Sequence, residues 1–172
     1  MGRPLLAIAA TLLLLAPAPA EASEGEWFYD LSAGYSAMSV QGPWLHLPTF
    51  RAGLGYFPSD FSVAVLQGVV SGTAKEGEYL QQVGLRGEYR LLIDAFEWVP
   101  SVGPVAGIMG SYDAGEGLDA FAFLGLTACV DYRPTRDEAF GLCGDVTIVP
   151  GHTYYQSMWA IMFNYSGFLL DW

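Results

Sequence analysis

Side chains of alternating polarity recur along most of the chain, in segments of about ten residues or slightly more. Between Leu118 and Tyr132, every even-numbered residue is apolar, whereas the odd-numbered row includes Asp119 and Asp131. Successive side chains of a β-strand point to opposite faces, so this period of two predicts strands. Clusters of Gly, Pro, Ser, Asp and Asn between the segments are typical of turns. The predicted strands span approximately residues 26–39, 46–57, 61–71, 79–91, 97–111, 118–132, 139–149 and 156–170.

Two of these segments carry a weaker signal. Residues 61–71 are apolar on both faces, so the pattern does not indicate which face is inward. The segment 97–111 contains Pro100 and Pro104, and each proline lacks the N–H that a strand residue donates to its neighbour. We therefore predict a shortened or bulged strand there rather than no strand.

The polar rows combine small residues with a few ionised ones. Such rows make a poor solvated surface but a suitable filling for a narrow lumen. Only 15% of the residues are charged, against about 25% in ordinary soluble domains, and Lys75 is the one lysine. The apolar rows, with aromatic residues near their ends, match the lipid-facing band of a membrane barrel. The sequence thus predicts an all-β fold, an eight-stranded antiparallel up-and-down transmembrane β-barrel with its apolar rows outside.

Charged residues of both signs lie on the rows that this arrangement turns inward, where they neutralise one another across the lumen. Arg90 and Glu97 flank the turn near Asp94, and we predict that they pair. The expected lumen charge network consists of Arg51, Arg86, Glu88, Arg90, Glu97, Asp119, Asp131 and Asp145.

Connections of two lengths are expected to alternate along the chain. Tight turns are expected at residues 58–60, around Asp94 and at 134–138. Slightly longer linkers are expected near Gly42 and at residues 72–78, 113–117 and 150–154. With eight strands, both ends of the barrel segment then lie on one side, which would be the periplasmic side.

The first residues are typical of an export signal. Arg3 precedes an apolar run from Leu5 to Ala16, and Ala20 and Ala22 form a small-residue cleavage pattern. The run is shorter than the roughly 20 residues that a membrane-spanning helix needs, although a retained anchor is the alternative interpretation. We expect a signal peptide at residues 1–22 and a barrel domain at residues 23–172.

Cys129 and Cys143 lie on two consecutive predicted strands. If they pair directly, the hairpin centres on Arg136 and places Tyr132 opposite Phe140. An exported chain with two cysteines in one hairpin favours a structural disulfide, and two free buried thiols are the alternative. A metal site is not expected, because no histidine is nearby in the sequence.

The export signal, the eight amphipathic segments, the pairs Gly34-Tyr35 and Gly55-Tyr56 and the final aromatic residue resemble small outer-membrane barrels of the OmpA transmembrane-domain and OmpX-like type. The resemblance covers residues 27–172 and implies residence in the outer membrane of a diderm bacterium. It also implies that Phe168, Leu170 and Trp172 form the signal read by the barrel-assembly machinery. A bulge at Ser166 and Gly167 is needed to bring these residues into phase with the earlier apolar row of the same strand.

The leading functional hypothesis is a non-enzymatic barrel with a structural or interaction role. Eight strands leave little room for a large pore. The balance of 7 basic and 18 acidic residues argues against nucleic acid as a partner. Expected partners are outer-membrane lipid and, during biogenesis, the assembly machinery. The expected state is a monomer without a cofactor.

Two alternatives belong to other functional classes. The first is a lipid-modifying enzyme, a lipid A deacylase or acyltransferase, with His152 and Ser157, or His46, near the outer rim. The H-x-S spacing of one such deacylase family is absent, because Thr153 and Tyr154 follow His152. The second is a soluble periplasmic barrel that binds an apolar ligand in lipocalin fashion, which requires the aromatic rows to face inward.

Overall fold

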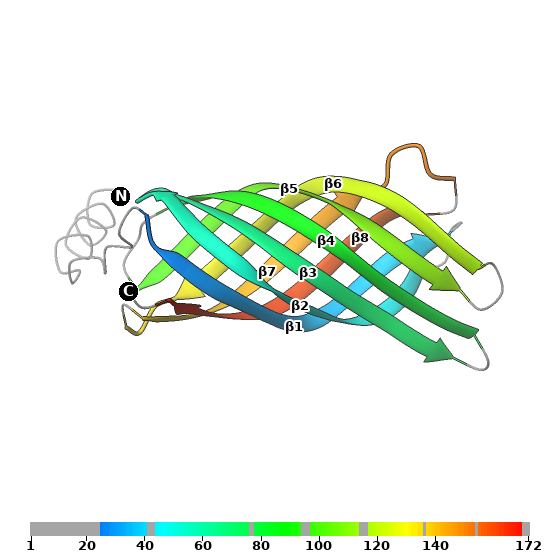
Figure 1. The fold of residues 1–172 in the computed structure, drawn as a ribbon, viewed down its shortest axis with the longest axis horizontal. Coiled ribbons are helices and arrows are strands. Elements are labelled where there is room, and N and C mark those ends of the chain that lie inside the picture. Colours follow the sequence, from blue (N-terminus) through cyan, green and yellow to red (C-terminus); the bar gives the residue numbers. More distant parts are fainter. Residues whose placement is uncertain are drawn as a thin grey trace, which may run out of the picture.

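Eight long strands make up most of the chain in the computed structural model (Figure 1). The structure describes residues 25–40, 44–75, 78–93, 97–113, 117–135, 137–153 and 155–169. The strands are β1 (Trp27–Val40), β2 (Trp44–Ser59), β3 (Ser62–Lys75), β4 (Glu78–Leu92), β5 (Trp98–Asp113), β6 (Gly117–Tyr132), β7 (Glu138–Ile148) and β8 (Tyr155–Phe168). Within these described ranges, no helix is long and apolar enough to cross a membrane. The predicted signal peptide at residues 1–22 lies outside them.

Each strand pairs antiparallel with the next, and β1 pairs with β8 to close the barrel. This confirms the predicted all-β, eight-stranded, up-and-down fold. Closure matters energetically because it leaves neither β1 nor β8 as an open sheet edge with unpaired N–H and C=O groups.

The barrel has two ends, which we call the terminal end and the loop end. β1 begins and β8 finishes at the terminal end (Figure 1), which also holds the connections 60–61, 93–97 and 133–137. The loop end holds the connections 41–43, 76–77, 114–116 and 149–154. The predicted difference in length between the two sets is wrong. Several strands run further toward the loop end than the alternation indicated, and β3 continues to Lys75.

β5 is a full-length strand despite its two prolines. It pairs with β6 without interruption, from Trp98 opposite Tyr132 to Asp113 opposite Gly117, so the predicted shortening or bulge is wrong. The pairing with β4 has a gap at Gly103 and Pro104. The missing N–H of Pro104 is therefore accommodated on one side of the strand, and the other side keeps its full ladder.

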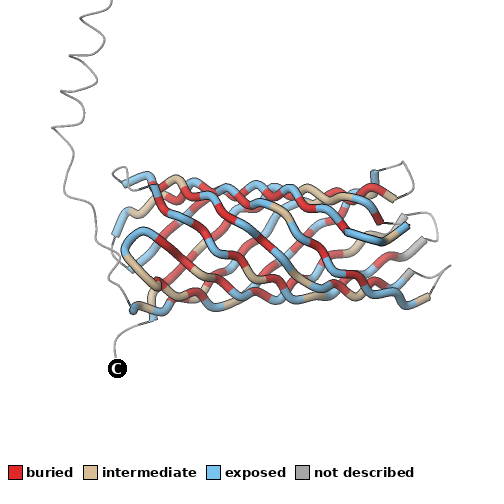
Figure 2. The backbone as a smooth tube through the Cα atoms, turned by 90° about the horizontal axis from the view of Figure 1, so that it is seen from above, coloured by how far each residue is buried: buried red, intermediate tan, exposed pale blue. Residues whose placement is uncertain are grey.

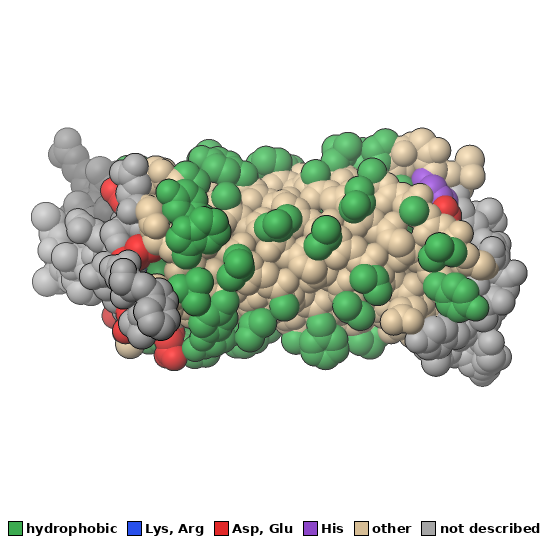
Figure 3. Space-filling view, in the orientation of Figure 1, with side chains coloured by type: hydrophobic (Ala, Val, Ile, Leu, Met, Phe, Trp, Pro, Cys, Tyr) green, Lys and Arg blue, Asp and Glu red, His purple; other side chains and the backbone are tan. Residues whose placement is uncertain are grey.

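Buried and exposed residues alternate along most of the strands (Figure 2), although β1 departs from this pattern between Ala33 and Ser39. The apolar rows face outward, and Leu126 is 62% exposed in the middle of β6. β3, whose orientation the sequence left open, turns Val63, Val65 and Gln67 inward and Leu66 outward. Hydrophobic side chains spread over the outer wall, whereas the acidic ones on the face shown in Figure 3 lie at the two ends. The lipocalin-like alternative is contradicted, because it required the aromatic rows to face inward.

Aromatic side chains gather on the outer wall near both ends. At the terminal end, ring pairs form a collar, with centroid separations of 4.9 Å for Trp27 and Tyr56 and 4.9 Å for Trp98 and Tyr132. Further along this collar, Phe140 lies 5.1 Å from Tyr165. At the loop end, the ring contacts join three strands, β8, β1 and β2. The residues of this loop-end group are Trp159, Tyr35 and His46.

The register of the β6–β7 hairpin is the one predicted from the cysteines. Cys129 pairs with Cys143 and Tyr132 with Phe140. The two cysteines form a disulfide with a Cα–Cα distance of 4.1 Å. The predicted disulfide is therefore present, and the alternative of two free thiols is wrong.

Candidate functional site in the barrel lumen

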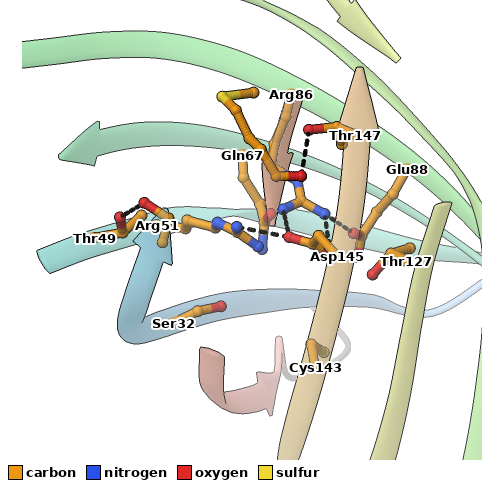
Figure 4. Close-up of polar contacts among 12 residues, drawn as sticks. Ser32, Thr49, Arg51, Gln67, Arg86, Glu88, Thr127, Cys143, Asp145 and Thr147 are labelled. Atoms are coloured by element: carbon orange, nitrogen blue, oxygen red, sulfur yellow. Dashed lines mark hydrogen bonds and ion pairs between the residues drawn. The ribbon is translucent and has the colours of Figure 1, made fainter. Parts of the chain in front are cut away.

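The centre of the lumen holds a carboxylate shared by two arginines. Asp145 projects from β7, and Arg51 from β2 and Arg86 from β4 converge on it (Figure 4). Arg51 Nη2 and Arg86 Nη1 each lie 2.6 Å from Asp145 Oδ2. Three strands that are far apart in the sequence are thus tied together across the bore.

The ion pairs continue from this point toward the terminal end. Arg86 also contacts Glu88, and Arg90 Nε lies 3.1 Å from Glu88 Oε1. Arg90 Nη1 lies 3.6 Å from Asp131 Oδ2. Positive and negative groups therefore alternate in an unbroken chain in which each residue is at most 9% exposed. We call this chain the lumen ion chain, and it consists of Arg51, Asp145, Arg86, Glu88, Arg90 and Asp131.

All six members of the lumen ion chain were expected in the lumen from their position on the polar rows. Two other expected members lie elsewhere. Glu97 is exposed within the terminal-end connection 93–97, and Asp119 is exposed at the loop end. The predicted pairing of Arg90 with Glu97 is wrong, because Arg90 turns into the lumen toward Glu88 and Asp131.

Asp30 is a buried lumen carboxylate that the sequence analysis did not assign to the network. It accepts hydrogen bonds from Ser32 Oγ at 3.1 Å, from Ser166 Oγ at 3.0 Å and from Gln67 Nε2. Asp30 lies on the polar row of the first predicted segment, and this position indicates that its side chain faces the lumen. Its partners were not evident, because Ser166 reaches it only when β1 and β8 close the barrel.

Apolar layers lie above and below the polar centre. The loop-end layer consists of Met38, Leu47, Val69, Leu80, Val105, Met109, Phe121, Phe123, Val149 and Tyr155. The terminal-end layer consists of Phe28, Phe57, Val63, Val65, Leu92 and Val99, with Phe168 packed against it. Apolar side chains thus gather toward both ends of the lumen, with buried polar residues such as Gln82 and Ser111 among them toward the loop end.

Two small cavities lie among the described residues of the lumen. One cavity of about 40 Å³ lies between the loop-end layer and the lumen ion chain, with Arg51, Arg86 and Asp145 in its lining. A second cavity of about 10 Å³ lies among residues of the terminal-end layer. Such volumes hold at most a few water molecules, since one water needs roughly 10–15 Å³ of this space.

His152 occupies the loop end, where it connects the 149–154 segment to β6. Its Nδ1 accepts the backbone N–H of Tyr155 at 3.1 Å, so the proton resides on Nε2, which donates to Asp119 Oδ2 at 2.8 Å. Ser157 pairs with the outward-facing Ile148 and therefore lies on the outer wall. His46 stacks on Tyr35, with ring centroids 5.4 Å apart.

These positions separate the candidate catalytic residues. Both ring nitrogens of His152 are engaged by groups other than a nucleophile, and Ser157 lies on the outward face. His46 is stacked at a different place on the rim. Among the described residues, no group of three or more His, Cys, Asp or Glu side chains is placed to hold a metal ion.

The last part of β8 differs from the prediction. Pairing with β1 runs without a shift through Ser166 and Gly167, so the expected bulge is absent there. Phe168 consequently faces the lumen and stacks on Phe57, with centroids 5.7 Å apart. The bulge in β8 occurs at the loop end, opposite Met38 and Val40, and it turns Tyr155 inward. Leu170 and Trp172 lie outside the described residues.

A closed eight-stranded antiparallel barrel with an apolar outer wall and a filled lumen is the architecture of small outer-membrane barrel proteins. The chain is similar to Neisserial surface protein A, with a TM-score of 0.75 and 11% identity over 85% of this chain and 100% of that one. It is similar to OprG from Pseudomonas aeruginosa, with a TM-score of 0.57 and 8% identity over 88% of this chain and 99% of that one.

The attachment invasion locus protein Ail of Yersinia pestis is a further neighbour, with a TM-score of 0.55 and 11% identity over 84% of this chain and 98% of that one. No protein-family model and no curated protein sequence matches the chain. At these identities the likeness concerns the fold, and at that level it confirms the predicted resemblance to small outer-membrane barrels.

Proposed function

We propose that this chain is an outer-membrane protein of a diderm bacterium in which a closed barrel serves as a scaffold with a structural or interaction role. The observation that carries the proposal is the combination of an apolar outer wall with a lumen blocked at three levels. Lipid is then the partner of the wall, and the barrel functions as a monomer without a cofactor.

The dimensions of the wall support a membrane location. Trp44 and Tyr56 lie near opposite ends of β2, and a strand tilted by about 40° with a rise of about 3.3 Å per residue places them roughly 30 Å apart along the barrel axis. The hydrocarbon core of a bilayer is about 30 Å thick. In this orientation the terminal end faces the periplasm. The final residues, with Leu170 and Trp172, are then available there to the barrel-assembly machinery.

The filled lumen supports a role other than that of an open pore. An ion that crosses the barrel meets the loop-end layer, then the lumen ion chain and then the terminal-end layer. The cavities of about 40 Å³ and about 10 Å³ are separated by these side chains. Passage therefore requires rearrangement of a packed interior.

The lipid-modifying alternative gains no support from the rim. A serine hydrolase needs a base within hydrogen-bond reach of its nucleophile. His152 contacts Asp119 and the Tyr155 amide, and Ser157 lies on the outward face. We therefore propose a non-enzymatic role.

We do not expect this chain to bind polyanions. Ail has been crystallised with a heparin analogue, sucrose octasulfate. In this chain Arg51, Arg86 and Arg90 are buried in the lumen, which withdraws them from the surface, and the sequence is strongly acidic. Such an exterior repels sulfated ligands.

Membrane fractionation, gel mobility and conductance in planar bilayers test the proposal. The protein is expected to sediment with the outer membrane, to require detergent for release, and to migrate faster on a gel when unheated than when boiled. In planar bilayers it is expected to give no conductance steps under conditions in which a porin control gives them. Release in plain buffer would contradict the membrane location, and sustained steps would contradict the closed lumen.

A further inference from the structure

The disulfide lies in the interior of the barrel. Cys129 is 2% and Cys143 9% exposed, and both pack against Ala160 and Met162 of β8. Arg90 Nη1 lies 3.9 Å from Cys143 Sγ, so the bond also borders the lumen ion chain. The two sulfur atoms are thus enclosed by the wall on one side and by packed lumen residues on the other.

The residues that the structure describes leave no route for a protein to these sulfur atoms in the closed barrel. The strand ladders from β1 to β8 form a continuous wall. The loop-end layer and the terminal-end layer cover the bore above and below, and the cavity beside the lumen ion chain is about 40 Å³. Thiol–disulfide exchange proceeds by direct attack of a thiolate on a disulfide sulfur, through a mixed disulfide that joins the two proteins. The closed barrel has no room for such an intermediate.

We propose that a periplasmic thiol–disulfide oxidoreductase makes the Cys129–Cys143 bond on the exported chain before the barrel closes. One cysteine thiolate attacks the disulfide of the oxidant and forms a mixed disulfide. The second thiolate then displaces the oxidant from it. The Cys129–Cys143 bond forms, and the oxidant leaves as a dithiol that carries the two electrons and two protons. This order rests on the proposed function, because it requires export to an oxidising compartment and closure in the membrane.

The early bond also selects the strand register. Linking Cys129 to Cys143 on an open chain brings β6 and β7 together with Tyr132 opposite Phe140. A slip of one residue would turn the outward row of one strand into the lumen. The oxidation step therefore fixes which face of this hairpin meets lipid before the remaining strands assemble.

The order of events is tested by pulse labelling in cells. Chains trapped with an alkylating agent are separated into folded and unfolded forms by unheated gel electrophoresis, and their thiols are counted after denaturation. Oxidised chains are expected already in the unfolded form. An unfolded form that stays fully reduced, together with a folded form that becomes oxidised later, would overturn the proposal.

The accessibility of the site is tested with purified protein. Barrel folded in the presence of reductant is mixed with an oxidised thiol–disulfide oxidoreductase, before or after unfolding in urea. Oxidation is expected to be at least 100-fold slower in the folded sample. A control with Cys129→Ser, Cys143→Ser and Glu97→Cys places one thiol at an exposed site, and this thiol is expected to react at similar rates in both samples. Equal rates for the native pair would overturn the proposal.

If the reduced chain does not fold, the reverse reaction gives the same information. The folded oxidised barrel is exposed to a reduced oxidoreductase and is expected to keep its disulfide until urea is added, whereas prompt reduction of the folded barrel would overturn the proposal.

Gel mobility and membrane fractionation of the same material distinguish failure of this proposal from failure of the proposed function. A protein that shows neither the mobility shift on heating nor sedimentation with the membrane contradicts the proposed function. A closed membrane barrel whose disulfide reacts with the oxidoreductase contradicts only the proposed order of oxidation.

Discussion

Arg86 connects two carboxylates in the interior, since it contacts both Asp145 and Glu88. Buried ions are costly to desolvate, and the chain of alternating charges offsets this cost only as long as every member is present. Arg86 thus determines whether two buried negative charges remain compensated.

Replacing Arg86 with leucine is expected to lower the free energy of unfolding by about 3 kcal/mol, because Asp145 and Glu88 each lose a buried partner. Urea titration in detergent micelles, followed by the mobility of the folded form on an unheated gel, measures the change. Glu97→Gln is the control, because Glu97 is exposed at the terminal end and its replacement is expected to cost less than about 0.5 kcal/mol. Equal effects would show that the lumen ion chain does not stabilise the barrel.

His152 and Asp119 illustrate a contact of the opposite kind. The pair is solvent-exposed, and such pairs contribute about 0–1 kcal/mol. His152→Ala is therefore expected to leave the unfolding midpoint nearly unchanged and to speed proteolysis within residues 149–154, which lose their contact with β6. Asp60→Asn, at the other end of the barrel, serves as the control. Unchanged cleavage would show that the contact does not order this segment.

The sequence indicated which residues face the lumen more reliably than which residues pair there. The period of two assigns Arg90 to the inside, and Glu97 is its predicted partner because the two residues flank one turn. Glu97 lies beyond the lumen, and Arg90 instead contacts Asp131 on β6. Contacts across the bore depend on strand tilt and stagger, which local polarity does not specify.

At the scale of the strand, two irregularities separate prediction from structure. The prolines of β5 suggested a defect in that strand, yet the β5–β6 ladder is continuous, because a proline disturbs only the side toward which its N–H would point. In β8 the sequence predicts a bulge at Ser166 and Gly167, whereas the bulge lies at the opposite end of the strand. The apolar row from Trp159 to Tyr165 keeps one phase, and the shift occurs before it, next to Tyr155.

Glycines of β5 determine how closely it approaches β4. A Cβ at Gly103 would overlap the carbonyl oxygen of Tyr89 and lie 2.8 Å from Arg90 Cα, whereas a Cβ at Gly110 would lie 3.6 Å from its nearest neighbour, the oxygen of Val83. Gly103→Ala is expected to separate the two strands locally and to lower the free energy of unfolding by about 1–3 kcal/mol. Gly110→Ala is the matched control and is expected to be nearly neutral. The same urea titration compares the two variants, and equal midpoints would contradict the close packing of β4 and β5 at Gly103.

For the whole molecule, the alternation predicted the closed barrel and its inside-out polarity. It did not predict the layered lumen. Phe28 and Val63 share their face with Asp30 and Gln67, so the inward rows mix apolar and polar residues. Only the three-dimensional stagger of the strands sorts them into layers.

The outward orientation of the apolar side chains can be tested by introducing a charge at two positions along β6. Leu124 lies in the middle of the wall, whereas Leu118 is 82% exposed at the loop end. Leu124→Arg is expected to cost about 2–4 kcal/mol in lipid vesicles, and Leu118→Arg about 0–1 kcal/mol, since the penalty for a charge falls toward the bilayer surface. Urea unfolding in vesicles measures both. A penalty that does not depend on depth would contradict the assignment of this wall to lipid.

Paired rings are more numerous in the terminal-end collar than in the loop-end group, and in the proposed membrane location this affects how the barrel sits in the bilayer. On the outer wall, ring pairs surround much of the terminal end, whereas the paired rings of the loop end lie on β8, β1 and β2, and Tyr112 of β5 is exposed there as well. Aromatic rings hold their depth at a membrane interface. The immersion of the molecule is therefore set from the leaflet that contacts the terminal end. Where the surrounding membrane thickens or thins, the opposite leaflet is then expected to accommodate the mismatch.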